Sequence, residues 1–160
     1  MKYYIIETDK KNPLPDIRGI SSKIPIRYIT PEYYHKLEDY YIFDMKTGDE
    51  TLLPDIFTFP FLMVKKELFK VIMMYMPEIE TKYMSLIDSE KKQYETYIIP
   101  ILEVVERKTI EATDFSERIL FYVSDVSERH VVARFDILES FLRRNAIGLK
   151  ISEFSAVRRR

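Results

Sequence analysis

The sequence contains no cysteine and no tryptophan, and it has only two histidines and three glycines among its 160 residues. Without cysteine, the chain can form no disulfide, no thiolate metal site and no cysteine nucleophile. The glycines, Gly19, Gly48 and Gly148, stand far apart, so the sequence holds no glycine-rich phosphate loop and no dinucleotide-binding fingerprint. These absences exclude the standard sequence motifs of nucleotide-dependent enzymes.

Long hydrophobic runs and a strong net charge are also lacking. The longest uncharged apolar stretches, "IFTFPFLMV" and "VIMMYM", fall well short of the roughly 20 residues that span a bilayer. The apolar stretch near the amino terminus ends at Glu7, which is too early for a signal peptide. A net charge of −1 gives no general attraction to nucleic acid or to an anionic membrane. We therefore expect a cytoplasmic protein with no membrane or nucleic-acid partner.

The residues that are present predict a packed core. Hydrophobic residues make up 46% of the chain and charged residues 32%, and twelve tyrosines and ten phenylalanines supply large apolar surfaces. This balance is typical of a globular protein. The length fits one domain, 1–160, whose amino-terminal 50 residues form a strand, loop and helix region.

Periodic patterns predict strands and helices in both halves of the chain. The residues at 2–8, 82–88, 94–107, 118–125, 130–135 and 149–154 are rich in β-branched and aromatic types, which favours strands. Pro100 predicts an edge position or a bulge for the third of these. Helices are predicted at 30–41, 63–77 and from 136 onward, where Asp136 and Glu139 have capping-box spacing.

The arrangement of a helix, a stop and then a strand occurs twice, near 64–87 and 136–154. Both segments predict an amphipathic helix that lies on a sheet. The fold class predicted from this order is α+β, as a single domain with a mostly antiparallel sheet and amphipathic helices packed on it.

The candidate chemical groups give no catalytic pattern. His35 and His130 lie far apart in the sequence, and neither has a neighbouring acid or nucleophile at a spacing typical of a dyad or a metal site. Carboxylates in residues 78–117 outnumber basic side chains by ten to five, which indicates a solvated acidic face or a protein-binding surface. We predict no catalytic residue, no metal ligand and no cofactor.

Arg143 and Arg144 are adjacent near the end of the last predicted helix. Cations at this end interact favourably with the helix dipole. Recognition helices contact DNA bases with their amino-terminal residues, and here that end carries Asp136 and Glu139. The pattern therefore favours a structural role over nucleic-acid recognition.

Five segments of residues 51–154 occur in a characteristic order: "LLPDIFTFPFLMVKKELFKVI", "YMSLID", "YIIPILEVVE", "ILFYVSD" and "HVVARFDILESFLRRNAIGLKISEF". In this order they resemble the eleventh numbered immunity-protein family of bacterial polymorphic toxin systems, first described as a domain of unknown function. The resemblance implies a small cytoplasmic protein that is not an enzyme and that neutralises a cognate protein toxin by covering its active site or an essential surface.

The residues that we select first as the contact surface combine aromatic area with negative charge, because tyrosine is enriched at interfaces and charge accelerates association. They are Tyr40, Tyr41, Glu103, Glu106, Glu111 and Asp114. The alternatives are a hydrolase-like enzyme built on carboxylates and a histidine, or a nucleic-acid-binding regulator. A histidine in a concave pocket with acidic partners would favour the enzyme.

Overall fold

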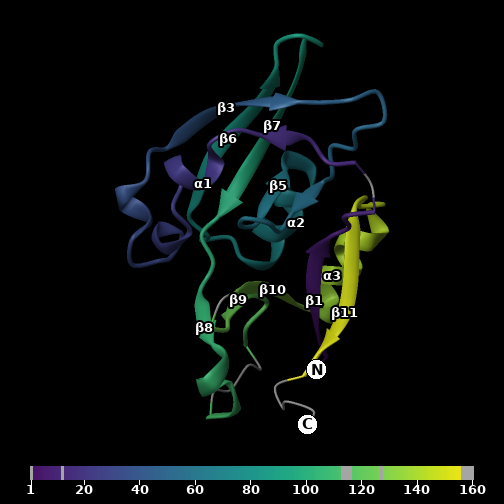
Figure 1. Cartoon of the computed structure of the whole chain (residues 1–160). Coiled ribbons are helices and arrows are strands. Elements are labelled where there is room, and N and C mark those ends of the chain that lie inside the picture. Colours follow the sequence, from purple (N-terminus) through teal and green to yellow (C-terminus); the bar gives the residue numbers. More distant parts are fainter. Residues whose placement is uncertain (1, 12, 113–116, 127, 156–160) are drawn as a thin grey trace.

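The computed structural model describes residues 2–11, 13–112, 117–126 and 128–155, and in this part of the chain the strands form two sheets (Figure 1). The first sheet has the order β11 (Leu149–Phe154), β1 (Tyr3–Thr8), β10 (Arg129–Arg134), β9 (Leu120–Ser124) and β8 (Val104–Glu106). The second has the order β2 (Asp16–Ile17), β3 (Tyr40–Lys46), β6 (Thr81–Asp88), β7 (Gln93–Pro100), β5 (Met63–Lys65) and β4 (Ile56–Phe57). The predicted α+β class is confirmed, with two sheets in place of one.

Neighbouring strands are antiparallel except at two places, where β3 pairs with β6 and β8 pairs with β9 in parallel. The longer helices are α2 (Lys66–Tyr75) and α3 (Phe135–Arg143). The short helical segments are α1 (Ile20–Lys23), η1 (Ile26–Tyr28), η2 (Tyr34–Lys36) and η3 (Arg107–Ala112). No helix in the described part of the chain is long and apolar enough to cross a membrane.

The predicted twofold arrangement corresponds to two similar units. In the first unit, β5 leads into α2 and then β6, and both strands flank the antiparallel β7. In the second unit, β10 leads into α3 and then β11, and both strands flank the antiparallel β1. Each unit is thus a strand, a helix and a strand with a third strand inserted between the two, which is a split β-α-β arrangement.

The two units share one hydrophobic core. Helix α2 buries Leu68, Phe69, Val71 and Ile72, and α3 buries Ile137, Leu138 and Phe141 in the same cluster. The Tyr75 hydroxyl lies 3.2 Å from the Asp136 carbonyl and 2.8 Å from Ser140 Oγ, which joins the helices by hydrogen bonds. A second core cluster lies on the other face of the six-stranded sheet, where residues 20–37 cover it.

The helix predicted at 30–41 is wrong. Thr30 does accept a hydrogen bond from the Tyr33 amide, at 3.1 Å, but only the short η2 follows, and β3 begins at Tyr40. Aromatic residues favour a pleated, half-buried surface, and pairing with β6 outweighs the weak helical signal of this segment.

Two further predictions are wrong in detail. The residues at 94–107 form two strands in different sheets, and β7 lies between β6 and β5 in the sheet, with Pro100 as its last residue. The capping box at Asp136 and Glu139 does not form, because the N-cap of α3 is Arg134, two residues before Asp136. Asp136 instead makes two hydrogen bonds of 2.7 Å with the Arg134 guanidinium.

Candidate functional site

One face of the six-stranded sheet is only half covered by α2. Val64, Ile98, Tyr83 and Tyr40 lie side by side in the register of β5, β7, β6 and β3. The first two are buried in the core that contains α2, whereas Tyr83 is 41% exposed and Tyr40 is 48% exposed. The helix therefore covers this face at β5 and β7 and leaves it open at β6 and β3.

The open half of the sheet carries more large side chains than these two. In the next row, Ile42 on β3 is exposed and lies beside Ser85 on β6. Tyr94 on β7 is 74% exposed and pairs with Ile87. Because alternate residues of a strand point to the same side, these side chains share one surface. We call Tyr40, Ile42, Tyr83 and Tyr94 the tyrosine face.

Polar contacts within this surface fix one of its rings. The Tyr40 hydroxyl forms a hydrogen bond with Ser85 Oγ, and Ser85 Oγ lies 3.0 Å from Thr96 Oγ1 on β7. The three residues come from three neighbouring strands, so the hydroxyl groups connect β3, β6 and β7 across the open face. Tyr40 therefore presents its ring in a fixed position.

Strand β3 is attached to β6 by buried polar groups near both of its ends. Before β3, the buried Lys82 ammonium donates hydrogen bonds to Asp39 Oδ1 at 2.9 Å and to the Leu37 carbonyl at 3.2 Å. After β3, the buried Asp88 carboxylate accepts hydrogen bonds from the Thr47 hydroxyl and amide. The Thr47 hydroxyl holds the pKa of Asp88 below its usual range. These contacts fix the strand that carries half of the tyrosine face.

The six residues selected from the sequence do not form one surface. Tyr40 belongs to the tyrosine face, but Tyr41 points to the opposite side of β3, where its ring stacks on Phe43 with centroids 6.0 Å apart. Glu103 binds the Arg118 guanidinium at 2.8 and 3.1 Å, and Glu106 lies 3.2 Å from Lys108 Nζ.

The last two selected residues fall at the edge of what the structure describes. Glu111 belongs to η3, and the structure describes its backbone but not its side chain. Asp114 lies outside the described residues. Glu106 forms part of β8 in the five-stranded sheet, whereas Tyr40 belongs to β3 in the other. Glu106 therefore does not extend the tyrosine face.

Sequence reasoning missed three of the four residues of the tyrosine face, Ile42, Tyr83 and Tyr94. The signal that could have found them is the alternation of "YYIFDMK", "TKYMSLID" and "QYETYIIP", where every second residue faces away from the second core cluster. The parallel pairing of β3 with β6, which brings these positions together, is not visible in the sequence.

A charged cleft of about 630 Å³ lies on a different part of the molecule. The end of β1 and residue Thr58 meet at its wall, where the Thr8 amide donates to Thr58 Oγ1 and the Thr58 amide donates to Thr8 Oγ1, both at 2.8 Å. Its lining includes three cationic side chains, two acidic ones and a histidine. These are Lys10, Arg27, Arg129, Glu7, Glu128 and His130.

His130 satisfies the condition stated above for the enzyme alternative. Its Nε2 lies 3.4 Å from Glu128 Oε2, and both residues line the cleft. His35 is exposed in η2, where its ring meets Tyr34, and it does not line the cleft. Among the residues that the structure describes, no group of three or more metal-ligating side chains could hold a metal ion.

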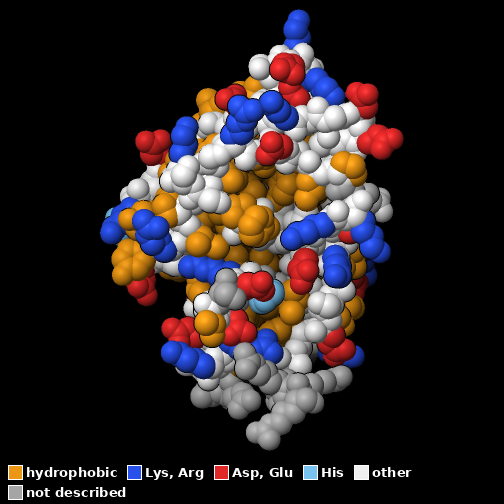
Figure 2. Space-filling view, in the orientation of Figure 1, with side chains coloured by type: hydrophobic (Ala, Val, Ile, Leu, Met, Phe, Trp, Pro, Cys, Tyr) orange, Lys and Arg blue, Asp and Glu red, His pale blue; other side chains and the backbone are white. Residues whose placement is uncertain are grey.

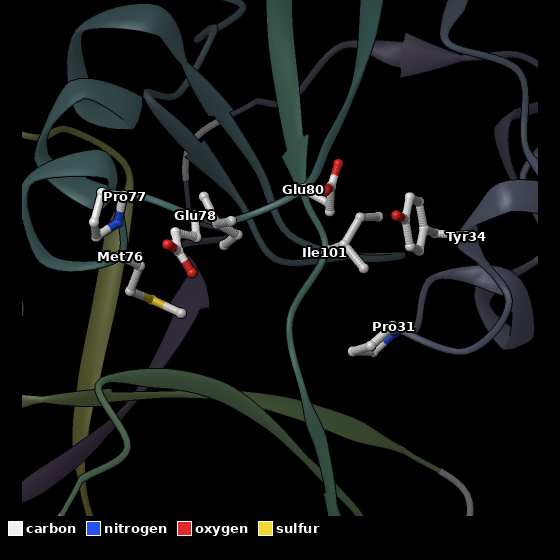
Figure 3. Close-up of a pocket in the computed structure, with 8 residues that line it drawn as sticks. Pro31, Tyr34, Met76, Pro77, Glu78, Glu80 and Ile101 are labelled. Carbon is white, nitrogen blue, oxygen red and sulfur yellow. The ribbon is translucent and has the colours of Figure 1, made fainter.

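A second hollow, of about 440 Å³, is mostly hydrophobic (Figure 3). Met76, Pro77 and Glu78 lie on one side of it, and Tyr34 and Pro31 lie on the other. Figure 2 views the molecule from the side opposite to Figure 3, and it shows hydrophobic side chains in the middle of that other face, with charged side chains around them. The described residues that line the hollow include no histidine, serine or threonine.

No protein-family model matches the chain, and a comparison with curated proteins gives no match.

Proposed function

We propose that this chain is a cytoplasmic immunity protein that binds and neutralises a cognate protein toxin, and that the tyrosine face is its contact surface. The observation that carries the proposal is the half-covered sheet, where three exposed tyrosines and one isoleucine lie on neighbouring strands. The resemblance of residues 51–154 to an immunity-protein family suggests the class of partner.

The physical properties of this surface support protein binding. Tyrosine provides a large apolar area and a hydroxyl group, and it is enriched among the residues that contribute most to binding energy. Because Tyr40 is held by Ser85 and β3 is attached to β6 at both ends, little conformational entropy is lost when a partner binds. A contiguous exposed hydrophobic patch is itself a common mark of an interaction site.

The experiment pairs this protein with the toxin-like product of a gene encoded beside its own. We expect co-expression to protect cells, and the purified pair to form a complex. Replacing both Tyr83 and Tyr94 by alanine should weaken the complex by about 30-fold or more, because the loss of even one residue at the centre of an interface costs about 2 kcal/mol or more.

The matched control is Tyr33→Ala, which removes an exposed tyrosine outside the tyrosine face. It should leave affinity and protection unchanged. Equal affinity of the double variant and the original protein would reject the tyrosine face as the contact surface. Absence of a complex with every neighbouring toxin-like product would reject the immunity function.

An enzyme is the second candidate function, and the position of His130 beside Glu128 in the cleft favours it. A neutral histidine oriented by a carboxylate can act as a general base. The same protection assay separates the candidates, because neutralisation by binding does not require His130. If His130→Gln abolishes protection while the complex still forms, the enzyme replaces the binding protein as the better explanation.

A further inference from the structure

The charged cleft has an open aromatic wall that the proposed function does not use. Phe59, which follows β4, is 73% exposed and lines the cleft, and Lys10 Nζ lies 5.7 Å from the centre of its ring. Ile26 and Pro60 add apolar surface to the lining. A smaller hollow of about 190 Å³ also includes Phe59, Pro60 and Lys10, so the ring stands between two hollows. A large exposed ring in this setting offers a stacking surface for a planar group.

Three separate segments of the chain bring positively charged side chains into the same cleft. Lys10 follows β1, Arg27 lies in η1 and Arg129 begins β10. The lining also holds two carboxylates, Glu7 and Glu128, so the three cations exceed the acidic side chains by one even when the histidine is counted as neutral. The cleft therefore carries an excess of positive charge although the whole chain is close to neutral.

The Arg129 guanidinium is held in the wall of the cleft by two contacts, so its positive charge has a fixed position there. Its Nη1 donates to the Ile29 carbonyl at 3.2 Å, and its guanidinium lies 5.5 Å from the centre of the Tyr122 ring. Burial lowers the pKa of Arg129 from its ordinary value, because removal from water disfavours the charged form. An anion in the cleft would interact favourably with this partly desolvated cation.

We propose that the cleft binds a small anionic ligand that carries a planar aromatic ring, of which a nucleoside monophosphate is the simplest example. The ring would stack on Phe59, and the phosphate would bind Lys10, Arg27 and Arg129. The volume of about 630 Å³ lies within the usual range for small-molecule sites, about 300–1,000 Å³. This site is independent of the tyrosine face, so either proposal can fail without the other.

The test is isothermal titration of the whole chain with AMP at low salt. Adenosine, which lacks the phosphate, and inorganic phosphate, which lacks the ring, are the two ligand controls. We expect AMP to bind more tightly than either, because each control retains only one of the two contacts. Equal affinity for inorganic phosphate and AMP would overturn the aromatic part of the proposal, and no binding of AMP would overturn all of it.

Variants locate the bound ligand. Phe59→Ala and the double change Lys10→Gln with Arg27→Gln alter exposed side chains, so the fold should persist. Each should weaken AMP binding by roughly tenfold, from lost stacking or lost charge. Tyr94→Ala and Lys70→Gln are the matched controls, because they remove an exposed ring and an exposed cation outside the cleft. AMP binding that is unaffected by both cleft variants would place the ligand elsewhere and overturn the proposal.

Discussion

The two split β-α-β units begin alike and end differently. Each helix starts directly after a strand, and each N-cap is a basic residue in an extended conformation, Lys65 in the first unit and Arg134 in the second. The second strand of the first unit, β6, has a further neighbour, β3, whereas β11 in the second unit is at the edge of its sheet. The tyrosine face exists only where β3 has been added. One supersecondary unit thus ends either in a sheet edge or in a wider sheet face, depending on whether another strand pairs with its last strand.

The largest effect on the free energy of unfolding should come from substitutions in the hydrophobic core that the two units share. Phe141 on α3 is 1% exposed and Phe69 on α2 is 7% exposed, and both belong to the same cluster. We expect Phe141→Ala and Phe69→Ala each to lower the free energy of unfolding by about 3–5 kcal/mol, since a buried phenylalanine leaves a cavity. Denaturant unfolding, followed by circular dichroism and by tyrosine fluorescence, should give one coincident transition for each variant.

Leu142→Ala is the control for these variants, because Leu142 is next to Phe141 on the same helix but is exposed. Its effect should be well below that of Phe141→Ala. Two separate transitions, one for each unit, would show that the shared core does not couple them.

A substitution in the connection from α3 to β11 should have the next largest effect on the free energy of unfolding. Gly148 in this connection lies close to Pro54, which precedes β4 of the six-stranded sheet. Gly148 has φ +83°, and a Cβ placed there would lie 2.7 Å from Pro54 Cβ. The amide of the adjacent Ile147 also donates to Asp55 Oδ2 at 2.8 Å. We expect Gly148→Ala to lower the free energy of unfolding by more than about 1 kcal/mol, since alanine disfavours positive φ.

Gly48→Ala separates this effect from a general cost of removing glycine. The nearest atom to a Cβ at Gly48 is Thr51 Oγ1, at 3.5 Å, which is ordinary contact. Thermal unfolding should show this variant within about 0.5 kcal/mol of the original protein. If both variants were equally destabilised, neither the positive φ of Gly148 nor its close approach to Pro54 would be the cause.

The sequence predicts strands and helices better than it predicts the candidate site, and β3 shows the reason. Strong local patterns predict β1, β6, β9 and β10 and the helices α2 and α3, because alternation and helical spacing are properties of each segment alone. Tyr40 and Tyr41 look equivalent in the sequence, yet Tyr40 is exposed and Tyr41 is partly buried against the second core cluster. A step of one residue along a strand reverses the face, and only the pairing with β6 decides which face is covered.

The cleft shows the same limit over a longer distance. Lys10, Arg27 and Arg129 come from three segments whose sequences share no motif. The reciprocal hydrogen bonds between Thr8 and Thr58 bring two of the surrounding segments together, and the Arg129 contact with the Ile29 carbonyl brings a third. Such a site depends on tertiary contacts, which local sequence patterns do not contain.

The smallest effect on the free energy of unfolding should come from Asp136 in the second unit, and it should depend on pH. The Arg134 guanidinium, through its hydrogen bonds, holds the pKa of Asp136 below its ordinary value. A carboxyl group whose pKa is lower in the folded state stabilises the fold above its unfolded pKa of about 3.9, and this contribution disappears as the pH falls through the folded pKa. Asp136→Asn should therefore lower the free energy of unfolding near pH 7 and have little effect near pH 2.

The size of this difference should be below about 1 kcal/mol, because the Asp136 side chain is 39% exposed and solvent screens the pair. Asp88 remains in both proteins, so its own acid dependence cancels in the comparison. Glu139→Gln is the control on the same helix, since it removes a carboxylate whose partner, Arg143, is largely exposed. A constant difference between the Asp136 variant and the original protein from pH 2 to pH 7 would mean that Asp136 acts through its shape and not its charge.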